Sequence, residues 1–556
     1  MLATGGASSS ELAHDNPAGL RFYQRADASS RPLSIPPAAR RRAMNRIVIV
    51  GGGTAGWMAA IAIADRFPEK QITVVDARAM GPLGVGESVT GVVLEFVGDP
   101  LHRLSVGEFF RRCEPTFKLG IWYQDWHGPG TEYLSPIDAP PSYFQHSYET
   151  AMEEFYQLAA ANGAKLGQVQ LHAELMRQGR TDHFRNPDGS VNTQIGFASC
   201  HFDALKFAAW MMEVAASRPN ITHLDDVVEG FAQEPESGHV ASVRTRGGQE
   251  IAGDFFIDCS GFHRLLLAKA CAPRWKSYAD WIRVDSAIPQ LVPYAPGQAI
   301  PNFTRATALP HGWMWQIPTQ SRLGRGYVFS SRYISDEQAI AEFRATGVEV
   351  GESPRILRFE PGRYEQQWIG NVCAIGLAGV FSEPLEATTI HGMSVQIRLL
   401  TELLFPHLAR AALPSLAASY NRLVAAAYDD YVDFISFHYH TGRADTEFWR
   451  DYQKPSAMTP ANQERMERWR HAFPAREDFA PIYTQQAKLT SGLLVWAPML
   501  CGMGLLRPEH ARRMVALSRH PREMQENAAR YLQLRNRIIP TALTQAEAIA
   551  HFRQQA

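Results

Sequence analysis

The first well-defined pattern along the chain is a run of β-branched residues at 47–50, Ile-Val-Ile-Val, without polar alternation. Such a run is typical of a parallel strand that is buried on both faces. A glycine-rich turn at 51–56 follows at once, and the apolar, alanine-rich segment after it predicts a helix over 57–67. A second apolar run at 72–75 predicts another strand. The order of strand, turn, helix and strand predicts a Rossmann-like α/β body.

The turn matches the G-x-G-x-x-G dinucleotide-binding fingerprint in its full structural context. We expect Gly51 to permit the tight turn, Gly53 to let the backbone approach a pyrophosphate, and Gly56 to allow close packing of the helix on the sheet. Asp76, at the end of the second strand, is expected to accept a hydrogen bond from a ribose hydroxyl. The alternative, a glycine-rich turn without a ligand, is disfavoured because both strands and the acidic residue are present. The predicted cofactor-binding residues are Gly51, Gly53, Thr54, Ala55, Gly56 and Asp76.

The fingerprint alone does not distinguish FAD from NAD, because both carry an adenosine diphosphate. The glycines at 324 and 326 lack the strand-turn-helix context of a second fingerprint. A single dinucleotide site in a chain of 556 residues favours a tightly bound flavin, with reducing equivalents supplied by another protein.

Beyond about residue 400 the apolar residues recur at helical spacing, most clearly over 403–413 and 416–437. We therefore predict three regions. Residues 1–43, rich in Ala, Ser, Pro and Arg, form a disordered extension; 44–400 form the FAD-binding body with substrate-side insertions; and 401–556 form a largely helical cap. The substrate pocket is expected where the cap meets the body.

The composition argues against several classes of protein. With 55 Lys and Arg against 56 Asp and Glu, the chain lacks the excess of cations that nucleic-acid binding requires. The six cysteines are scattered without a C-x-x-C pair, which argues against a disulfide scaffold or a metal site and favours the cytoplasm. The uncharged run at 489–506 is interrupted by Pro498 and by glycines, so we interpret it as buried core rather than a membrane span.

Several further segments carry a family resemblance. Residues 312–318, Gly-Trp-Met-Trp-Gln-Ile-Pro, resemble the W-x-W-x-I-P signature of the flavin-dependent tryptophan halogenases, which are FADH2-dependent halogenases. Residues 84–88 resemble that family's flavin loop, 116–120 the segment with its catalytic lysine, and 383–389 the segment with its glutamate and halide-binding turn. Further similar blocks lie at 201–204, 258–262 and 443–450. Together the blocks run in family order from 46 to about 450.

The resemblance implies an FAD-binding fold of the flavin monooxygenase type and a two-step reaction. Reduced flavin, supplied by a separate NAD(P)H-dependent flavin reductase, would react with oxygen to a flavin hydroperoxide, and bound chloride or bromide would attack it to give hypohalous acid. This oxidant would then reach a small aromatic substrate, expected to be tryptophan, free indole or a derivative, in a separate pocket. The resemblance assigns the catalytic roles to Lys118 and Glu386. A homodimer is a possible assembly, and no nucleic-acid or membrane partner is expected.

The resemblance also implies further site residues. They are Gly86, Glu87 and Ser88 in the flavin loop; Thr388 and Thr389 at the halide-binding turn; Trp313 and Trp315 in a wall between flavin and substrate; and His146 and Tyr148 beside the substrate ring. Alternation places both tryptophans on one face of an extended segment, and a helix that starts near residue 390 would favour an anion. Plainer alternatives stay open. The threonines could only cap a helix, the tryptophans could only pack in the core, and His146 could have a structural role.

The residue types at the two catalytic positions agree with these roles. Lys118 lies in a mostly apolar segment, and an ammonium there is costly to bury unless it is paired or functional. A nearby Glu386 carboxylate would keep the lysine charged as a hydrogen-bond donor, while desolvation would favour the neutral amine as a nucleophile. Glu386 could act as a general base or stabilise a cationic intermediate. The alternative is a buried ion pair that only stabilises the fold.

Two positions depart from the family pattern. Ala387 stands where the family has a serine, which could alter hydrogen bonding to the substrate or to Glu386. Thr389 replaces a smaller residue beside the halide, so the halide preference could differ. Two rival functions remain: a flavin monooxygenase that hydroxylates an aromatic ring, and a flavin-binding scaffold without catalysis. Product formed without halide would favour the first, and absence of turnover with reduced flavin would favour the second.

Overall fold

The structure, a computed structural model, describes residues 44–77, 87–137, 148–193, 199–475, 478–479, 483–484, 487–488 and 493–555. The predictions for residues 1–43, for Gly86 and for His146 lie outside these ranges.

The predicted nucleotide-binding unit is built on a six-stranded sheet with the order β10-β2-β1-β14-β23-β22. All neighbouring strands are parallel except β22 and β23. The strands are β1 (Arg46–Val50), β2 (Gln71–Asp76), β10 (Ile221–Asp225), β14 (Phe255–Asp258), β22 (Trp368–Ile369) and β23 (Val372–Ala374). The helix α1 (Thr54–Arg66) connects β1 to β2, which confirms the α/β body that the sequence predicts.

Alternate residues of β1 pack into two different cores. Ile47 and Ile49 belong to the large core that α1 also joins, whereas Val48 and Val50 pack toward a small three-stranded sheet, β11-β12-β13. That sheet comprises β11 (Val228–Gln233), β12 (Val240–Thr245) and β13 (Glu250–Ala252). These four of the five residues of β1 are at most 2% exposed, which explains why they show no polar alternation.

A second sheet has seven strands, with the order β20-β16-β19-β18-β17-β5-β6. It is antiparallel apart from the parallel pair β17 and β5. Its strands are β5 (Gly120–Gln124), β6 (Glu132–Pro136), β16 (Ser286–Pro293), β17 (Thr304–Leu309), β18 (Gly312–Pro318), β19 (Arg322–Phe329) and β20 (Leu357–Arg358). Beside it, β9 (Ser199–Phe202) pairs on one edge with β3 (Glu87–Val89) and on the other with β4 (Thr116–Lys118).

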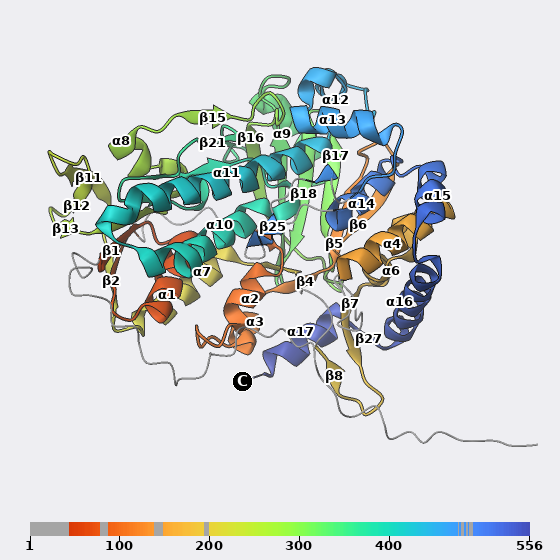
Figure 1. Cartoon of the computed structure of the whole chain (residues 1–556), viewed down its shortest axis with the longest axis horizontal. Coiled ribbons are helices and arrows are strands. Elements are labelled where there is room, and N and C mark those ends of the chain that lie inside the picture. Colours follow the sequence, from red (N-terminus) through yellow and green to blue (C-terminus); the bar gives the residue numbers. More distant parts are fainter. Residues whose placement is uncertain are drawn as a thin grey trace, which may run out of the picture.

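The C-terminal part of the chain is mostly helical, and the predicted helix over 416–437 is confirmed as α11 (Leu413–Phe437). In Figure 1, α11 runs lengthwise across the molecule above α10 (Thr388–Arg398). The other main helices are α12 (Glu447–Tyr452), α13 (Pro460–Trp469), α14 (Leu493–Gly502), α15 (Pro508–Leu517), α16 (Pro521–Thr541) and α17 (Gln545–Arg553). Helices α14, α15 and α16 pack against α4 (Tyr148–Ala161).

Three short strands interrupt this helical region: β25 (Tyr483–Thr484), β26 (Ala487–Lys488) and β27 (Ala542–Thr544). The helical periodicity of the sequence does not predict them. Because β27 pairs with β7 (Arg180–Arg185), the end of the chain returns to the part before residue 400. The division into a body and a cap at about residue 400 therefore stays a prediction.

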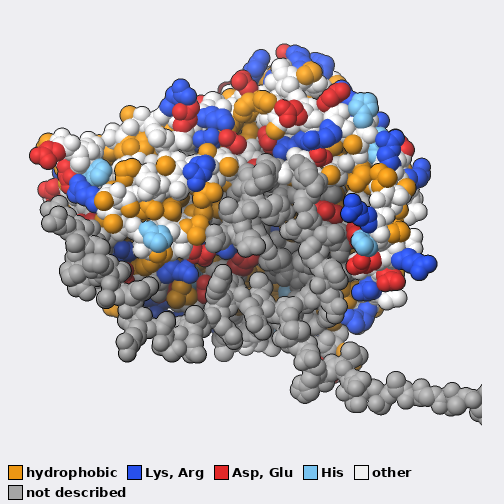
Figure 2. Space-filling view, viewed as in Figure 1, with side chains coloured by type: hydrophobic (Ala, Val, Ile, Leu, Met, Phe, Trp, Pro, Cys, Tyr) orange, Lys and Arg blue, Asp and Glu red, His pale blue; other side chains and the backbone are white. Residues whose placement is uncertain are grey.

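The surface and the buried apolar run agree with the composition. Figure 2 shows positive and negative side chains intermixed on the face in view. Within 489–506, Trp496 and Leu500 of α14 are fully buried. Among the described residues, no helix is long and apolar enough to cross a membrane, and no cluster of His, Cys, Asp and Glu is suited to hold a metal ion.

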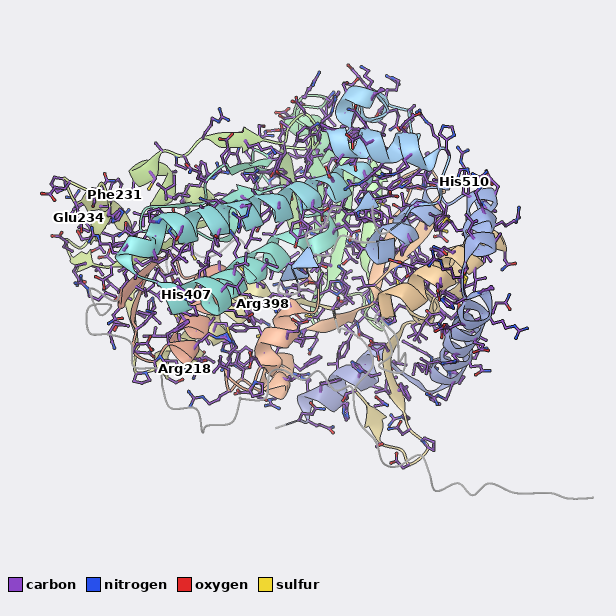
Figure 3. All side chains as sticks on the ribbon, in the orientation of Figure 1. Arg218, Phe231, Glu234, Arg398, His407 and His510 are labelled. Atoms are coloured by element: carbon purple, nitrogen blue, oxygen red, sulfur yellow. The ribbon has the colours of Figure 1, made fainter. Side chains whose placement is uncertain are left out.

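A buried ion pair fixes α1 against the following elements. Arg218, labelled in Figure 3, lies after α7 (Ala204–Ala216), and its Nε is 2.7 Å from Oδ1 of Asp65 in α1. His102 Nδ1 lies 3.1 Å from the other Asp65 oxygen. Burial raises the pKa of Asp65, but hydrogen bonds from His102 and Arg218 outweigh burial and lower it overall. The helix that carries the nucleotide turn is thereby held in one place.

Candidate active site

The glycines of the nucleotide turn have distinct packing roles. Gly51 has φ of 105°, and a Cβ there would lie 2.4 Å from the carbonyl oxygen of Cys259. A Cβ at Gly56 would lie 1.9 Å from the Gly51 oxygen, so both positions require glycine for the fold itself. Gly53 precedes α1, and a Cβ there would meet nothing within 4 Å. Space at the N-terminus of α1 suits a phosphate group, so this turn fits the pyrophosphate of FAD.

The remaining predicted cofactor residues flank this turn. Thr54 and Ala55 are the first residues of α1, whose first turn contains no acidic residue. The Asp76 carboxylate accepts a hydrogen bond from the Gly52 backbone at 3.0 Å, which holds the acid beside the turn. Glu87 and Ser88 lie on β3, and burial raises the pKa of Glu87 to about 7.

A hydrogen-bonded network joins the flavin-loop strand to the lysine strand. Ser88 Oγ lies 3.2 Å from Thr304 Oγ1, and Thr304 is 2.9 Å from Nε2 of His201 on β9. The other ring nitrogen of His201 is 2.9 Å from Oγ1 of Thr116 on β4. The block at 201–204, noted in the sequence for its resemblance, therefore contributes the residue that links the two strands.

The candidate catalytic lysine is buried. Lys118 ends β4 and is only 2% exposed. Burial lowers its pKa to about 8, although the negative charge of Glu386 opposes this shift. Among the described residues, Lys118 and Glu386 form no direct ion pair, so the purely structural ion pair considered from the sequence is not observed. The pKa thereby lies close to neutral pH, so the ammonium predominates at pH 7 while the neutral amine is also accessible.

Glu386 has an unusual backbone conformation. Its φ and ψ are 63° and 10°, and those of Ala387 are 58° and 30°, so two successive residues with side chains adopt the left-handed region. Each such residue costs about 1–3 kcal/mol and persists only where the surroundings enforce it. Two adjacent strained residues therefore lie at the segment with the candidate catalytic glutamate, directly before α10.

Two residues that the sequence interpretation missed hold the Glu386 carboxylate. Tyr123 of β5 donates its hydroxyl proton to Oε1. His438, which follows α11, places Nε2 3.2 Å from the same oxygen. Burial raises the pKa of Glu386, but His438, Lys118 and Tyr123 outweigh burial and lower it overall. Glu386 is thus favoured as a carboxylate despite its burial.

A buried glutamate, Glu383, contacts Trp313, one of the two tryptophans of the predicted wall. Glu383 accepts hydrogen bonds from the Trp313 indole at 2.9 Å and from the Tyr439 hydroxyl at 2.8 Å. The rings of Trp313 and Trp315 are 6.3 Å apart in the same core, whereas Met314 faces a different core. This arrangement confirms that the two tryptophans share one face of β18. Burial raises the pKa of Glu383 to about 7.

The two threonines of the predicted halide turn open α10. The helix begins at Thr388, two residues earlier than the sequence predicts, and Thr389 is its second residue. The residue that caps it is Ala387, and no side chain accepts a capping hydrogen bond. A plain side-chain cap, the alternative considered for these threonines, is therefore not formed. The helix N-terminus lies directly after Glu386.

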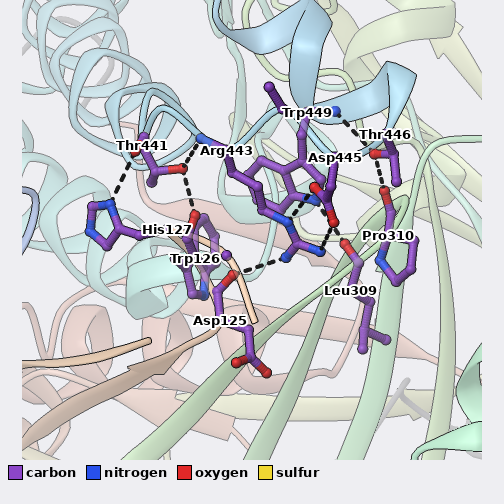
Figure 4. Close-up of polar contacts among 12 residues, drawn as sticks. Asp125, Trp126, His127, Leu309, Pro310, Thr441, Arg443, Asp445, Thr446 and Trp449 are labelled. Atoms are coloured by element: carbon purple, nitrogen blue, oxygen red, sulfur yellow. Dashed lines mark hydrogen bonds and ion pairs between the residues drawn. The ribbon is translucent and has the colours of Figure 1, made fainter. Parts of the chain in front are cut away.

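The block at 443–450, called the brace below, is held to residues near the ends of β5 and β17 by polar contacts (Figure 4). Arg443 makes a two-point ion pair with Asp445 and donates to the Asp125 carbonyl at 2.9 Å. Its guanidinium lies 4.9 Å from the centre of the Trp449 ring, whose Nε1 donates to the Leu309 carbonyl. These contacts join the turns after β5 and β17 to α12.

The brace positions a tryptophan between the two glutamate clusters. The Trp126 ring centre lies 5.3 Å from that of Tyr123, which holds Glu386, and 5.4 Å from that of Tyr439, which holds Glu383. No chemical motif in the sequence marks Trp126, Tyr123 or Tyr439. The predicted substrate residue Tyr148 begins α4, and its side chain lies outside the described residues.

Comparison with known proteins agrees with this geometry. The family model for tryptophan halogenases matches residues 46–518. The tryptophan 6-halogenase of Streptomyces toxytricini is 33% identical over 460 residues, covering 79% of this chain and 86% of the relative. The tryptophan 7-halogenase of Lentzea aerocolonigenes is 32% identical over 464 residues, covering 79% and 85%.

A solved flavin-dependent halogenase from Xanthomonas campestris superposes with a TM-score of 0.79 at 28% identity, covering 93% of this chain and 99% of that one. The family match extends over most of the sequence and includes the glycine turn, β4, the tryptophan strand and the Glu386 segment. The chain therefore belongs to the tryptophan halogenase family, whose members are flavin-dependent halogenases.

Proposed function

We propose that this chain uses reduced FAD, oxygen and chloride or bromide to halogenate an electron-rich aromatic ring of the indole type, such as tryptophan, free indole or a derivative. The observation that carries the proposal is one electrostatically coupled group formed by the buried Lys118 amine and the Glu386 carboxylate, whose side chain is only 11% exposed. Reduced FAD, when bound at residues 51–56, would supply two of the electrons that reduce oxygen and the halide would supply the other two, so that the products are oxidised FAD, hypohalous acid and water. A separate NAD(P)H-dependent flavin reductase delivers the electrons of the reduced FAD, since the chain carries a single dinucleotide fingerprint.

In this proposal Lys118 receives the hypohalous acid. A pKa of about 8 makes both forms of the side chain accessible near neutral pH. The ammonium can hold the acid by a hydrogen bond. Alternatively, the amine can take the halogen, in which case a nitrogen–halogen bond forms, the oxygen–halogen bond breaks, and water leaves. Either form delivers an electrophilic halogen from a fixed position.

Glu386 completes the substitution at the aromatic ring. Addition of the halogen makes the ring cationic, and aromaticity returns when the ring loses a proton. A buried carboxylate stabilises that cation and can accept its proton. The Tyr123 hydroxyl and His438 hold the carboxylate in position, and its lowered pKa keeps it ionised before the reaction.

The tryptophan pair supports a division between two compartments. Trp313 and Trp315 lie on one face of β18, and Glu383 fixes the indole of Trp313. A rigid aromatic wall would keep the aromatic substrate away from the flavin, which favours halogenation over direct hydroxylation. We assign halide binding to Thr388 and Thr389, at the N-terminus of α10.

Product analysis by mass spectrometry tests the proposal. Tryptophan, indoles and phenols are incubated with the protein, FAD, a flavin reductase, NADH, oxygen and either chloride or bromide. We expect a halogen isotope pattern on at least one indole-type substrate, and none when halide is omitted. Insertion of oxygen without halide would instead identify an aromatic hydroxylase, and absence of any product would contradict the assignment of an indole-type substrate.

A further inference from the structure

One face of the sheet β3-β9-β4 carries polar side chains on β4 and β9. In the register of these two strands, Thr116 lies opposite His201, and Lys118 lies opposite Ser199. Residues directly opposite each other in an antiparallel pair share a face, and so do residues two positions apart on one strand. All four residues are at most 2% exposed. The candidate catalytic lysine therefore shares a buried face with a serine.

Hydrogen-bond partners divide these four residues into two pairs. Thr116 Oγ1 lies 2.9 Å from Nδ1 of His201 and donates to the Pro318 carbonyl oxygen at 2.8 Å. Ser199 Oγ, by contrast, has no hydrogen-bond partner within the described part of the chain. The Lys118 amine also forms no hydrogen bond with any residue that the structure describes. Lys118 and Ser199 thus have hydrogen-bonding capacity that the described protein does not use.

The Lys118 amine lies beside the strand that carries Ser199. Burial raises the pKa of Cys200 and lowers the pKa of His201, and the positive charge of Lys118 acts to lower both values. These are the two residues that follow Ser199 on β9. The Cβ atoms of directly opposed strand residues are about 4.5–5.5 Å apart, and rotation about the χ1 bond of the serine can turn its hydroxyl toward the lysine side chain.

Hypohalous acid has hydrogen-bonding groups that match this pair. Its oxygen can accept a hydrogen bond from the Lys118 ammonium, which predominates at pH 7 because the pKa of Lys118 is about 8. Its O–H group needs an acceptor, and the oxygen of a serine hydroxyl has two lone pairs. A molecule held by the ammonium alone can rotate about that hydrogen bond. A second hydrogen bond to Ser199 would fix the direction in which the halogen points.

We propose that Ser199 hydrogen-bonds the hypohalous acid that Lys118 holds, and thereby directs its halogen toward the aromatic ring. The inference rests on the proposed function and adds a residue to the same site. No covalent bond forms or breaks at the serine, which only accepts a hydrogen bond. An acid held at two points escapes into solution less readily, so Ser199 favours halogen transfer to the ring over loss of the oxidant.

Ser199→Ala tests this role through the fate of the oxidant. The reaction contains the aromatic substrate and a dissolved 1,3-diketone, which takes up halogen from hypohalous acid that leaves the protein. We expect halogenated aromatic product per flavin oxidised to fall about two- to tenfold, as for the loss of one hydrogen bond, with a matching rise in halogenated diketone. A merely structural role would leave the ratio of the two products unchanged, and an unchanged ratio would overturn the proposal.

Ser330→Ala is the matched control. Ser330 follows β19, and like Ser199 it is buried with an Oγ atom that has no hydrogen-bond partner among the described residues. Its backbone N–H donates to the His311 carbonyl at 3.2 Å, so it lies outside the sheet β3-β9-β4. We expect the ratio of aromatic to diketone product to match that of the wild type. An equal change in both variants would attribute it to the removal of any buried hydroxyl and overturn the specific role of Ser199.

Thermal unfolding of the FAD-bound protein without substrate gives a readout that does not depend on activity. Because removal of an unpartnered buried hydroxyl relieves a desolvation cost, Ser199→Ala should unfold at the wild-type temperature or above it. A lower unfolding temperature would show that the hydroxyl supports the fold and would overturn the proposal. If the wild type halogenates neither the aromatic substrate nor the diketone, the proposed function itself is contradicted. If it halogenates the ring and Ser199→Ala keeps the product ratio, only the role of Ser199 fails.

Discussion

At the scale of single residues, Glu383 and Glu386 lie three positions apart, and their side chains are fully buried and 11% exposed, respectively, yet their pKa values move in opposite directions. Burial raises the pKa of Glu383 to about 7, because its hydrogen-bond donors, Trp313 and Tyr439, are neutral. The pKa of Glu386 is lowered because His438 and Lys118 outweigh burial. These opposite shifts agree with the proposed roles, in which Glu383 holds Trp313 in place and Glu386 acts as a base.

The role of Lys118 is tested by Lys118→Ala. We expect aryl halogenation to fall by at least about a thousandfold, because both the hydrogen-bond donor and the amine nucleophile are lost. FAD binding and oxidation of reduced flavin should be unchanged, since the lysine ends β4 of the sheet β3-β9-β4, whereas the nucleotide turn follows β1 of the six-stranded sheet. Product yield and flavin oxidation are measured in the same reaction. Halogenation at the wild-type rate would contradict the assigned role.

Glu383 makes a separate prediction about stability. Its pKa is about 7 instead of the ordinary 4.5, so between these values the folded protein binds a proton that the unfolded chain has released. Folding stability from this group is therefore complete below about pH 4.5 and is lost as the pH rises through 7. The shift corresponds to about 3 kcal/mol.

Glu383→Gln should remove that dependence. We expect the unfolding free energy of the variant, relative to the wild type, to increase by up to about 3 kcal/mol between pH 5 and pH 8, whatever the fixed cost of the substitution. Urea unfolding at both pH values measures the difference. Glu360→Gln, at an exposed position, is the control and should leave the pH dependence of the unfolding free energy unchanged. A constant difference for Glu383→Gln would mean that Glu383 does not titrate in this range.

At the scale of elements, β9 is the strand that relates the two halves of the candidate site. It pairs with β3, which carries Glu87 and Ser88, and with β4, which carries Lys118. The residue His201 hydrogen-bonds to Thr116 on β4 and, through Thr304, to Ser88 on β3. The flavin-loop strand β3 and the strand that ends in Lys118 are therefore connected both by backbone pairing through β9 and by these side-chain hydrogen bonds.

The nucleotide turn allows a comparison between two glycines of one element. Gly53→Leu should abolish FAD binding while the protein without FAD keeps its stability, because a Cβ there meets no protein atom within 4 Å and the space beyond it is where the pyrophosphate is expected. Gly51→Ala should instead destabilise the fold, since its Cβ would lie 2.4 Å from the Cys259 oxygen and its φ is 105°. FAD titration and thermal unfolding measure the two effects. Normal FAD affinity in Gly53→Leu would refute the assigned turn.

Sequence patterns predicted the elements whose function depends on periodicity or on short motifs. They include β1, α1, β2, α11 and the shared face of Trp313 and Trp315. The partners of Glu386 could not be predicted in this way. Tyr123 and His438 are 263 and 52 positions away in the chain, and nothing but the folded structure brings them to the carboxylate. The left-handed backbone at Glu386 and Ala387 was also missed, because neither residue type favours that conformation.

At the scale of the whole molecule, the end of the chain returns to the lysine strand. Phe552 of α17 packs 5.3 Å from the ring of Phe117, the residue before Lys118. The side chain of Gln545, at the start of α17, accepts a hydrogen bond from the Phe117 backbone N–H at 3.2 Å and donates to its carbonyl at 2.9 Å. The amide side chain of Gln545 thus pairs with both backbone groups of Phe117, as the backbone of a neighbouring strand would do. The C-terminal helix is part of what holds Lys118 in position.

This return predicts a catalytic effect from a residue distant in sequence. Gln545→Ala leaves the buried N–H and carbonyl of Phe117 without these partners, which should lower stability by about 2–4 kcal/mol. Because Lys118 is the next residue, turnover to halogenated product should fall more than FAD affinity does. Gln554→Ala, at an exposed position just after the same helix, is the control and should behave as the wild type. Product yield, FAD titration and urea unfolding are compared at a temperature where all three proteins are folded. If Gln545→Ala loses stability but keeps full turnover, the C-terminal helix supports the fold without positioning the lysine.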